Sequence, residues 1–117
     1  IDDEVICLDT MKLLLCGSDI YLSCFESPSQ GVDYILSNTD HIDLVVLDIM
    51  LPDENGIDLL RKLRQHKTCA EIPVILQSGI ADFEKIQSEA TTLGAILMRK
   101  PYTRDELLSQ IKLSLKQ

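Results

Sequence analysis

Apolar residues occur in short segments along the chain, some at helical spacing and others as continuous runs. Spacings of three and four residues predict amphipathic helices, whereas continuous β-branched runs predict buried strands. On this basis we predict helices at about residues 4–16, 28–37, 57–66, 82–93 and 104–115. We predict strands at about residues 20–25, 43–48, 72–77 and 95–99. Because strands and helices alternate, the sequence predicts an α/β fold in which helices cover both faces of a parallel sheet.

Two short motifs predict where helices begin. Ser27 and Gln30 have capping-box spacing around Pro28, a residue that is favoured at the first helical position. Thr103 and Glu106 have the same spacing and predict the start of the last helix. Each motif lies just before a stretch with helical spacing, so the local signal and the hydrophobic pattern agree.

Length and composition restrict the classes of protein that fit. A chain of 117 residues with 45% hydrophobic and 26% charged residues is typical of one globular domain. The formal net charge of −8 repels polyphosphate backbones, so we expect no direct nucleic-acid binding by this domain. No apolar run approaches the roughly 20 residues that cross a bilayer, and no secretory signal is recognisable. We therefore expect residues 1–117 to form a single domain without membrane contact, located in the cytoplasm.

Polar residues occur at the ends of the predicted strands. Asp48 ends an apolar run and is followed by a loop that contains proline and glycine, while Ser78 and Lys100 follow the next two strands. Asp2 and Asp3 lie at the start of the chain, just before the first predicted helix. The carboxyl ends of parallel strands gather at one edge of the sheet, which is where ligands bind in open α/β folds. We therefore expect these five side chains to share one shallow site.

Three carboxylates in one site require a compensating charge. Two unit charges about 5 Å apart repel by roughly 3 kcal/mol at an effective dielectric constant of about 20. Lys100 neutralises only part of this charge, and Mg²⁺ suits an open site with a few carboxylates and several waters. A carboxylate can also act as a nucleophile towards phosphorus, provided that the oxygens of the phosphoryl group are stabilised during transfer. Mg²⁺, the ammonium of Lys100 and the hydroxyl of Ser78 are suitable for that role.

These motifs together resemble the receiver domain of two-component response regulators. The matching features are the acidic stretch 2–4, the string L-D-I-M-L-P-D-E-N-G at 47–56, the pair 78–79 and the pair 100–101. The resemblance covers essentially the whole chain. It implies a flavodoxin-like three-layer sandwich with a parallel five-stranded sheet in the order 2-1-3-4-5 and five helices. It also implies a cis peptide bond between Lys100 and Pro101.

The resemblance further implies a magnesium site. By analogy with the family, Asp3 and Asp48 bind Mg²⁺ directly and Asp2 binds it through a water molecule. The backbone carbonyl of Met50 completes the set of protein ligands. The implied cofactor is therefore Mg²⁺.

The implied function is phosphorylation-dependent signalling. Asp48 is the residue that receives a phosphoryl group from a sensor histidine kinase or a phosphotransfer protein. Lys100 pairs with the phosphoryl group, and Ser78 moves to bind it. Phosphorylation then changes a surface that a downstream effector protein or domain recognises. The only intrinsic chemistry expected is self-phosphorylation from a phosphodonor and slow loss of the phosphoryl group, so the chain is not expected to be an enzyme.

The chain departs from the receiver pattern at its start. The family has an apolar first strand before the acidic pair, whereas only Ile1 precedes Asp2 in this sequence. Two neighbouring strands would then have unpaired inner edges, an arrangement that is prone to aggregation. We expect upstream residues to supply the first strand; the alternative is a strand from another chain or segment.

Three further positions differ from the family pattern. The position three before Lys100 is usually aromatic in the family, but here it is Leu97, which predicts a different or weaker conformational switch. Met50 and Ile80 occupy positions that tune the lifetime of the phosphoryl group. Neither side chain can orient an attacking water, so we predict slow self-dephosphorylation. The sequence leaves open whether the chain forms a homodimer through Leu97 and its neighbours.

Two other functions stay open from the sequence. A Mg²⁺-dependent phosphohydrolase with an aspartyl-phosphate intermediate would need a second acid two residues after Asp48, where this chain has Met50. A pseudo-receiver would be an interaction module that does not depend on phosphorylation. It would have no need for the five polar residues that we place in the site.

Overall fold

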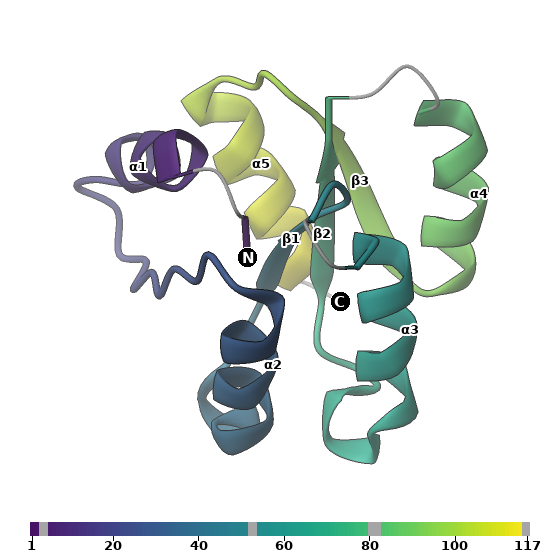
Figure 1. The fold of residues 1–117 in the computed structure, drawn as a ribbon. Helices are drawn as coiled ribbons and strands as arrows, with labels where there is room; N and C mark the ends of the chain where they lie inside the picture. Colours follow the sequence, from purple (N-terminus) through teal and green to yellow (C-terminus); the bar gives the residue numbers. More distant parts are fainter. Residues whose placement is uncertain (3–4, 52–53, 80–82, 116–117) are drawn as a thin grey trace.

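The computed structural model describes residues 1–2, 5–51, 54–79 and 83–115, and in this part of the chain three strands form a parallel sheet (Figure 1). The strands are β1 (Val45–Asp48), β2 (Val74–Ser78) and β3 (Ala95–Arg99). They are arranged in the order β1-β2-β3, and both neighbouring pairs are parallel. The predicted parallel α/β architecture is therefore confirmed for these strands.

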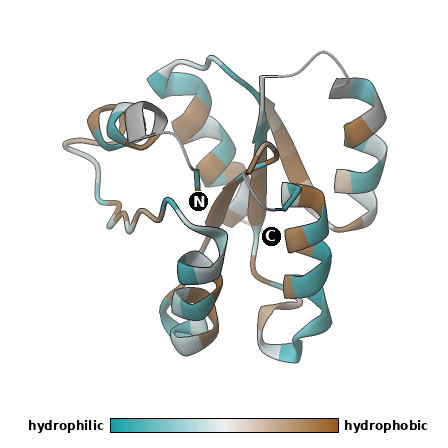
Figure 2. Cartoon of the chain, viewed as in Figure 1, coloured by the Kyte–Doolittle hydropathy of each residue, from teal (hydrophilic) through white to brown (hydrophobic). Residues whose placement is uncertain are grey.

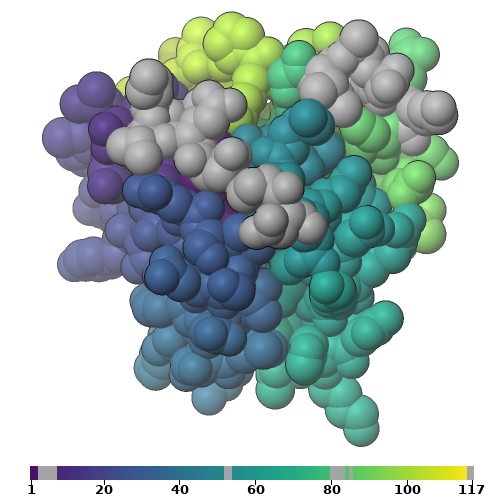
Figure 3. Space-filling model, viewed as in Figure 1, coloured from purple at the N-terminus to yellow at the C-terminus, as the bar shows by residue number. Residues whose placement is uncertain are grey.

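Helices cover both faces of this sheet. One face packs on α2 (Pro28–Ser37), α3 (Gly56–Gln65) and α4 (Phe83–Thr92), and the other packs on α1 (Val5–Leu14) and α5 (Arg104–Leu115). Figure 3 shows α2 and α3 side by side on the first of these faces. Two short 3-10 helices, η1 (Thr39–His41) and η2 (Lys67–Cys69), lie between these elements. None of the described helices has both the length and the hydropathy needed to span a membrane.

The central strand β2 shows why the apolar runs form this sheet. Every residue of β2 is buried, because β1 and β3 flank the strand and helices cover both of its faces. Such a strand needs a continuous apolar run. Leu76 packs into the core under α2, α3 and α4, and Ile75 packs into the core under α1 and α5. Figure 2 shows the hydrophobic residues concentrated on the strands and on the helix faces that meet them.

Local capping interactions set the starts of three helices. The Thr103 hydroxyl accepts a hydrogen bond from the backbone N–H of Glu106 at 3.1 Å, and Glu106 accepts one from the backbone N–H of Thr103 at 3.2 Å. This reciprocal pair confirms the predicted capping box before α5. Ser27 caps α2, as predicted. Asn55 caps α3 by accepting from the backbone N–H of Ile57 at 2.7 Å, which the sequence interpretation had not included.

Arg64, a residue of α3, holds the amino-terminal ends of β2 and β3 together. Its Nε donates to the carbonyl of Leu93 at 2.9 Å, and its guanidinium also donates to the carbonyls of Cys69 and Ile72 at 3.0 and 2.6 Å. A longer contact of 3.5 Å reaches the carbonyl of Gly94. One side chain therefore satisfies backbone acceptors that precede β2 and β3.

The sequence predicts a strand at residues 20–25, where the structure shows no regular secondary structure. The backbone N–H of Asp2 donates to the carbonyl of Phe25 at 3.1 Å. On the other side, the Ile1 amino group donates to the carbonyl of Val46 at 2.6 Å, and the N–H of Asp48 donates to the carbonyl of Ile1 at 3.0 Å. Ile1 and Asp2 thus lie between the 20–25 segment and β1.

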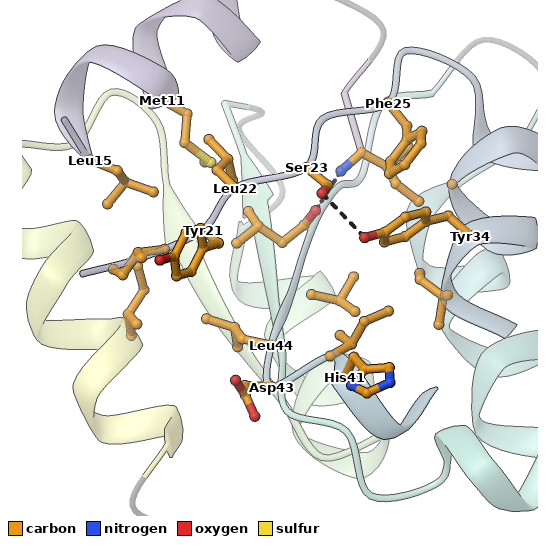
Figure 4. A pocket seen from close by; sticks show the side chains of 18 of the residues that line it. Met11, Leu15, Tyr21, Leu22, Ser23, Phe25, Tyr34, His41, Asp43 and Leu44 are labelled. Atoms are coloured by element: carbon orange, nitrogen blue, oxygen red, sulfur yellow. Dashed lines mark hydrogen bonds between the residues drawn. The ribbon is translucent and has the colours of Figure 1, made fainter. Parts of the chain in front are cut away.

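A cavity of about 390 Å³ lies beside Ile1 (Figure 4). Its walls come from α1, the 20–25 segment, α2, the chain around β1, and α5. Met11, Leu15 and Leu44 contribute apolar side chains. Tyr21 lines the opening and is fully exposed. The described part of the chain therefore leaves an apolar gap along the outer edge of β1, and the five-stranded order 2-1-3-4-5 is not seen in it.

Candidate functional site

Asp48 is fixed at the carboxyl end of β1 by the sheet itself. Its backbone N–H bonds to Ile1, and the next residue, Ile49, donates its N–H to the carbonyl of Gln77 at 3.1 Å. These bonds hold the main chain on both sides of Asp48, a residue that is 4% exposed. Oδ1 accepts a hydrogen bond from the backbone N–H of Met50 at 3.1 Å. The carboxylate is therefore both buried and oriented.

Lys100 joins Asp48 to the acid at the start of the chain. Its Nζ donates to Oδ2 of Asp48 and to Oδ2 of Asp2, in both cases at 2.9 Å. Its backbone N–H donates to the carbonyl of Ser78 at 2.8 Å, which continues the pairing of β2 and β3 beyond the strand ends. Asp2 is 1% exposed. The structure thus places Lys100 in contact with both Asp2 and Asp48 at one site, as the sequence predicted, and we call these three residues the acidic pocket.

Ser78 and Gly79 lie at the adjacent strand end. Ser78 is the last residue of β2, is fully buried, and is tied to Lys100 through the backbone hydrogen bond. Among the described atoms, a Cβ at Gly79 would come within 4 Å only of the Lys100 Cβ, at 3.9 Å. The described atoms therefore leave space beside Ser78. Asp3 and Ile80 lie outside the described residues, so their predicted roles stay predictions.

The loop after Asp48 approaches the strand end closely. Met50 and Asn55 form an antiparallel bridge across the loop, and the N–H of Gly56 donates to the carbonyl of Ile49 at 2.8 Å. A Cβ at Gly56 would lie 2.3 Å from the carbonyl oxygen of Asp48. Only glycine fits this position without moving the backbone. The Met50 side chain is 60% exposed, and the role of its carbonyl as a metal ligand stays a prediction.

The sequence interpretation missed Gln77 and Tyr102. Gln77 is buried in β2, where Nε2 donates to Oδ2 of Asp2 at 3.1 Å and Oε1 accepts from the hydroxyl of Tyr102 at 2.7 Å. One signal for Gln77 was present, namely a lone amide in an otherwise apolar run. A buried polar group needs hydrogen-bond partners, so a glutamine in a buried strand predicts a polar side chain near it at the same edge of the sheet.

Burial and pairing act in opposite directions on the charges of the pocket. Burial raises the pKa of Asp48, although the hydrogen bonds from Lys100 and Met50 oppose this effect. Burial favours the neutral amine of Lys100, but its bonds to Asp48 and Asp2 outweigh this effect and raise the pKa of Lys100 above its usual range. The ammonium therefore stays charged, and one cation faces two buried carboxylates. The excess negative charge suits a further cation.

The donor atoms of the pocket fit a hard cation. Among the residues that the structure describes, no three histidine, cysteine or acidic side chains gather in a metal-binding cluster. Asp2 and Asp48 nevertheless supply carboxylate oxygens, and Mg²⁺ in proteins often binds one or two carboxylates and keeps several waters. The described residues are therefore compatible with the predicted magnesium site, with Asp3 as the predicted additional ligand.

Two secondary predictions can be checked at β3 and just after it. The peptide bond between Lys100 and Pro101 is cis, as predicted. Leu97 is partly buried and packs against the core under α2, α3 and α4. The structure leaves open whether the chain forms a homodimer through Leu97 and its neighbours.

Comparison with known proteins agrees with this geometry. The chain is 32% identical over 119 residues to the transcriptional regulatory protein DltR of Streptococcus agalactiae, with 100% of the chain and 50% of that protein covered. It is 30% identical over 111 residues to the cell cycle transcriptional regulator CtrA of Caulobacter vibrioides, covering 95% of the chain and 46% of that protein. The chain therefore spans about half the length of these curated relatives.

Solved structures and the family profile point the same way. A response regulator receiver domain protein from Clostridium thermocellum has a TM-score of 0.88 and 28% identity, with 98% of this chain and 90% of that chain covered. A CheY-like receiver domain protein from Methanospirillum hungatei JF-1 has a TM-score of 0.84 and 27% identity, with 98% and 89% covered. The profile of the response regulator receiver domain matches residues 1–112. This chain belongs to the family of response regulator receiver domains, which act in two-component systems.

Proposed function

We propose that this chain is a phosphorylation-dependent switch in which Asp48 accepts a phosphoryl group from a sensor histidine kinase or a phosphotransfer protein. The observation that carries the proposal is the placement of the Asp48 carboxylate. It lies buried at a strand end, between the N–H of Met50 and the ammonium of Lys100, with Asp2 on the same ammonium. An oriented carboxylate with a fixed cation beside it has what an acceptor of a phosphoryl group needs.

In the proposed reaction, one oxygen of Asp48 attacks the phosphorus of a phosphohistidine. The new O–P bond forms as the P–N bond breaks, and the leaving imidazole nitrogen keeps the electron pair. Lys100 then exchanges its bond to Asp48 for bonds to oxygens of the transferred group, which it neutralises in part. The Ser78 hydroxyl donates to another of these oxygens. Mg²⁺ held by Asp2, Asp3, Asp48 and the carbonyl of Met50 would supply further positive charge when bound.

Chemical phosphorylation with a small donor tests this proposal directly. The chain is incubated with Mg²⁺ and acetyl phosphate, and its intact mass is measured. We expect the mass of one phosphoryl group to be added, and we expect Asp48→Asn to abolish this addition. Asp58→Asn is the matched control, because Asp58 is an exposed carboxylate on α3 that pairs with Arg61. Loss of the addition in the control, or its persistence in Asp48→Asn, would contradict the assignment of Asp48.

The competing phosphohydrolase has little support from the site. Such an enzyme needs an acid two residues after the nucleophile, and that position holds Met50, whose side chain is largely exposed. A steady-state assay with generic phosphomonoesters separates the two functions. A receiver should show almost no turnover in it.

We also propose that the complete sheet has the order 2-1-3-4-5, with a strand that runs into Ile1 filling the gap beside β1. The cavity of about 390 Å³ is lined by apolar side chains on both sides of this gap. The Ile1 amino group is buried, and burial lowers its pKa, yet it donates to the carbonyl of Val46. A peptide N–H would make the same hydrogen bond without a charge. These features favour an extended segment at this place.

The proposed partners follow from the switch. Response regulators interact with sensor kinases and effectors, and we propose one of each for this chain. Relatives named as transcriptional regulators are about twice as long as this chain. The net charge of −8 argues against DNA contact by the domain described here. Any such contact in a longer protein would then come from another segment.

A further inference from the structure

A second polar path leaves the acidic pocket through β2. Gln77 is 3% exposed and makes two side-chain hydrogen bonds, to Asp2 on one side and to Tyr102 on the other. Tyr102 lies two residues after Lys100 and two before the start of α5, and its half-buried ring packs on the core between the sheet and α5. The path therefore connects a residue of the pocket with the segment that leads into α5.

The charge of Asp2 fixes the direction of these hydrogen bonds. A carboxylate paired with an ammonium can only accept, so the amide of Gln77 must turn its NH₂ group towards Asp2. Its oxygen then faces Tyr102, whose hydroxyl must donate. Reversal of the amide would place two acceptors against each other at Asp2. The orientation of the Tyr102 hydroxyl is thus set by a carboxylate that it does not contact through any described hydrogen bond.

An apolar residue would satisfy the packing of β2 equally well, because the other positions of this strand before Ser78 are apolar. A buried amide is tolerated only when its donors and acceptor are paired, and an unpaired one destabilises the fold. Gln77 therefore stabilises the core less than an apolar residue would, and its hydrogen bonds to Asp2 and Tyr102 point to a role other than packing. Leu97, at the position where the family usually has an aromatic residue, has no polar group with which to make such a connection.

We propose that Gln77 is a positioning residue that holds Asp2 in the acidic pocket and couples this carboxylate to Tyr102. When Mg²⁺ and a phosphoryl group occupy the pocket, Asp2 and Lys100 change their contacts. Gln77 transmits this rearrangement to the segment before α5. This inference rests on the proposed function for the identity of the occupants. It extends that function by naming the residues through which the pocket reaches α5.

Magnesium affinity in four variants provides the main test. Mg²⁺ is titrated into isotope-labelled protein, and the dissociation constant is taken from the backbone amide resonance of Met50, which reports on Asp48. Removing a partner that orients a metal ligand typically weakens binding about 10- to 100-fold, so we expect Gln77→Met to weaken it about 10-fold. Tyr102→Phe should weaken it by a smaller factor. The double variant should match Gln77→Met alone, because the proposed coupling connects the Tyr102 hydroxyl to Asp2 through Gln77.

Tyr34→Phe is the matched control, because it removes a tyrosine hydroxyl whose contact is with Ser23, on the wall of the cavity. We expect its magnesium affinity to be unchanged. If the double variant weakens magnesium binding by the product of the two single-variant factors, the coupling is overturned. Unchanged affinity in Gln77→Met would overturn it as well.

A measurement without metal separates this inference from the proposed function. In Asp2→Asn the Gln77 amide no longer faces a carboxylate, so the ring resonances of Tyr102 should shift relative to those of the unmodified chain. The same Asp2→Asn change made in Gln77→Met should leave the Tyr102 resonances in place. Equal shifts in both backgrounds would overturn the link through Gln77. If the unmodified chain binds no Mg²⁺, the proposed function fails, and this measurement still decides the link.

Discussion

Gly56 is the first residue of α3, and its replacement by alanine tests how the loop supports the acidic pocket. A Cβ at this position would lie 2.3 Å from the carbonyl oxygen of Asp48 and 2.8 Å from the Cα of Ile49. Both are main-chain atoms, so relief requires a backbone shift. Overpacking of this kind costs about 1–3 kcal/mol. The shift also weakens the 2.8 Å bond from Gly56 to Ile49, which contributes about 1 kcal/mol. We therefore expect the free energy of unfolding to fall by about 2–4 kcal/mol.

Urea denaturation followed by far-ultraviolet circular dichroism measures this change. With a slope of about 2 kcal/mol per molar urea, the midpoint should fall by about 1–2 M. Gly79→Ala is the matched control at the same end of the sheet, because its nearest described atom is the Lys100 Cβ at 3.9 Å. Its effect should stay within about 0.5 kcal/mol. If Gly56→Ala is no more destabilising than Gly79→Ala, the close approach of the loop is not what requires glycine.

Two further predictions concern the pocket charge and the open edge of β1. Lys100→Met should lower the free energy of unfolding at pH 7 by about 3 kcal/mol, because it leaves Asp2 and Asp48 without their shared cation. The pKa of Lys100 is higher in the folded than in the unfolded chain, where it is 10.5. The stability difference between the unmodified chain and Lys100→Met should therefore be complete below pH 10.5 and shrink as the pH rises above it. A stability difference that grows above pH 10.5 would refute the pairing of Lys100 with the two carboxylates. Five valine and isoleucine residues added before Ile1 should slow amide hydrogen exchange in the 20–25 segment and raise the urea midpoint. The same extension with two prolines should do neither, and equal effects of both would count against a strand in the gap.

Features that depend on local sequence could be predicted without the structure. The capping box of Thr103 and Glu106 needs only residues of one helix turn, and it forms as expected. Asp48 and Lys100 were predictable for a different reason. Asp48 ends one apolar strand and Lys100 directly follows another, and parallel strands bring such positions to one edge whatever their separation in sequence.

Features that depend on a distant partner could not be predicted in the same way. The 20–25 segment has the composition of a strand, but a strand also requires a hydrogen-bonded neighbour. Between the described residues, the bond found there is the one from the N–H of Asp2 to the carbonyl of Phe25. The bonds of Gln77 to Asp2 and Tyr102 join residues 75 and 25 positions apart. Their register follows from tertiary packing, which hydrophobic periodicity does not encode.

The Arg64 contacts give the two ends of the sheet unequal chemical character. The guanidinium holds its charge at all ordinary pH values, and the described partners are main-chain carbonyls that neither titrate nor exchange ligands. The opposite end is built from carboxylates and an ammonium, whose bonds would change if the proposed Mg²⁺ and phosphoryl group bind there. Motion that follows the proposed phosphorylation should therefore fade towards Arg64. The carboxyl-terminal turn of α3 then offers a stationary reference point from which displacements of α5 can be measured.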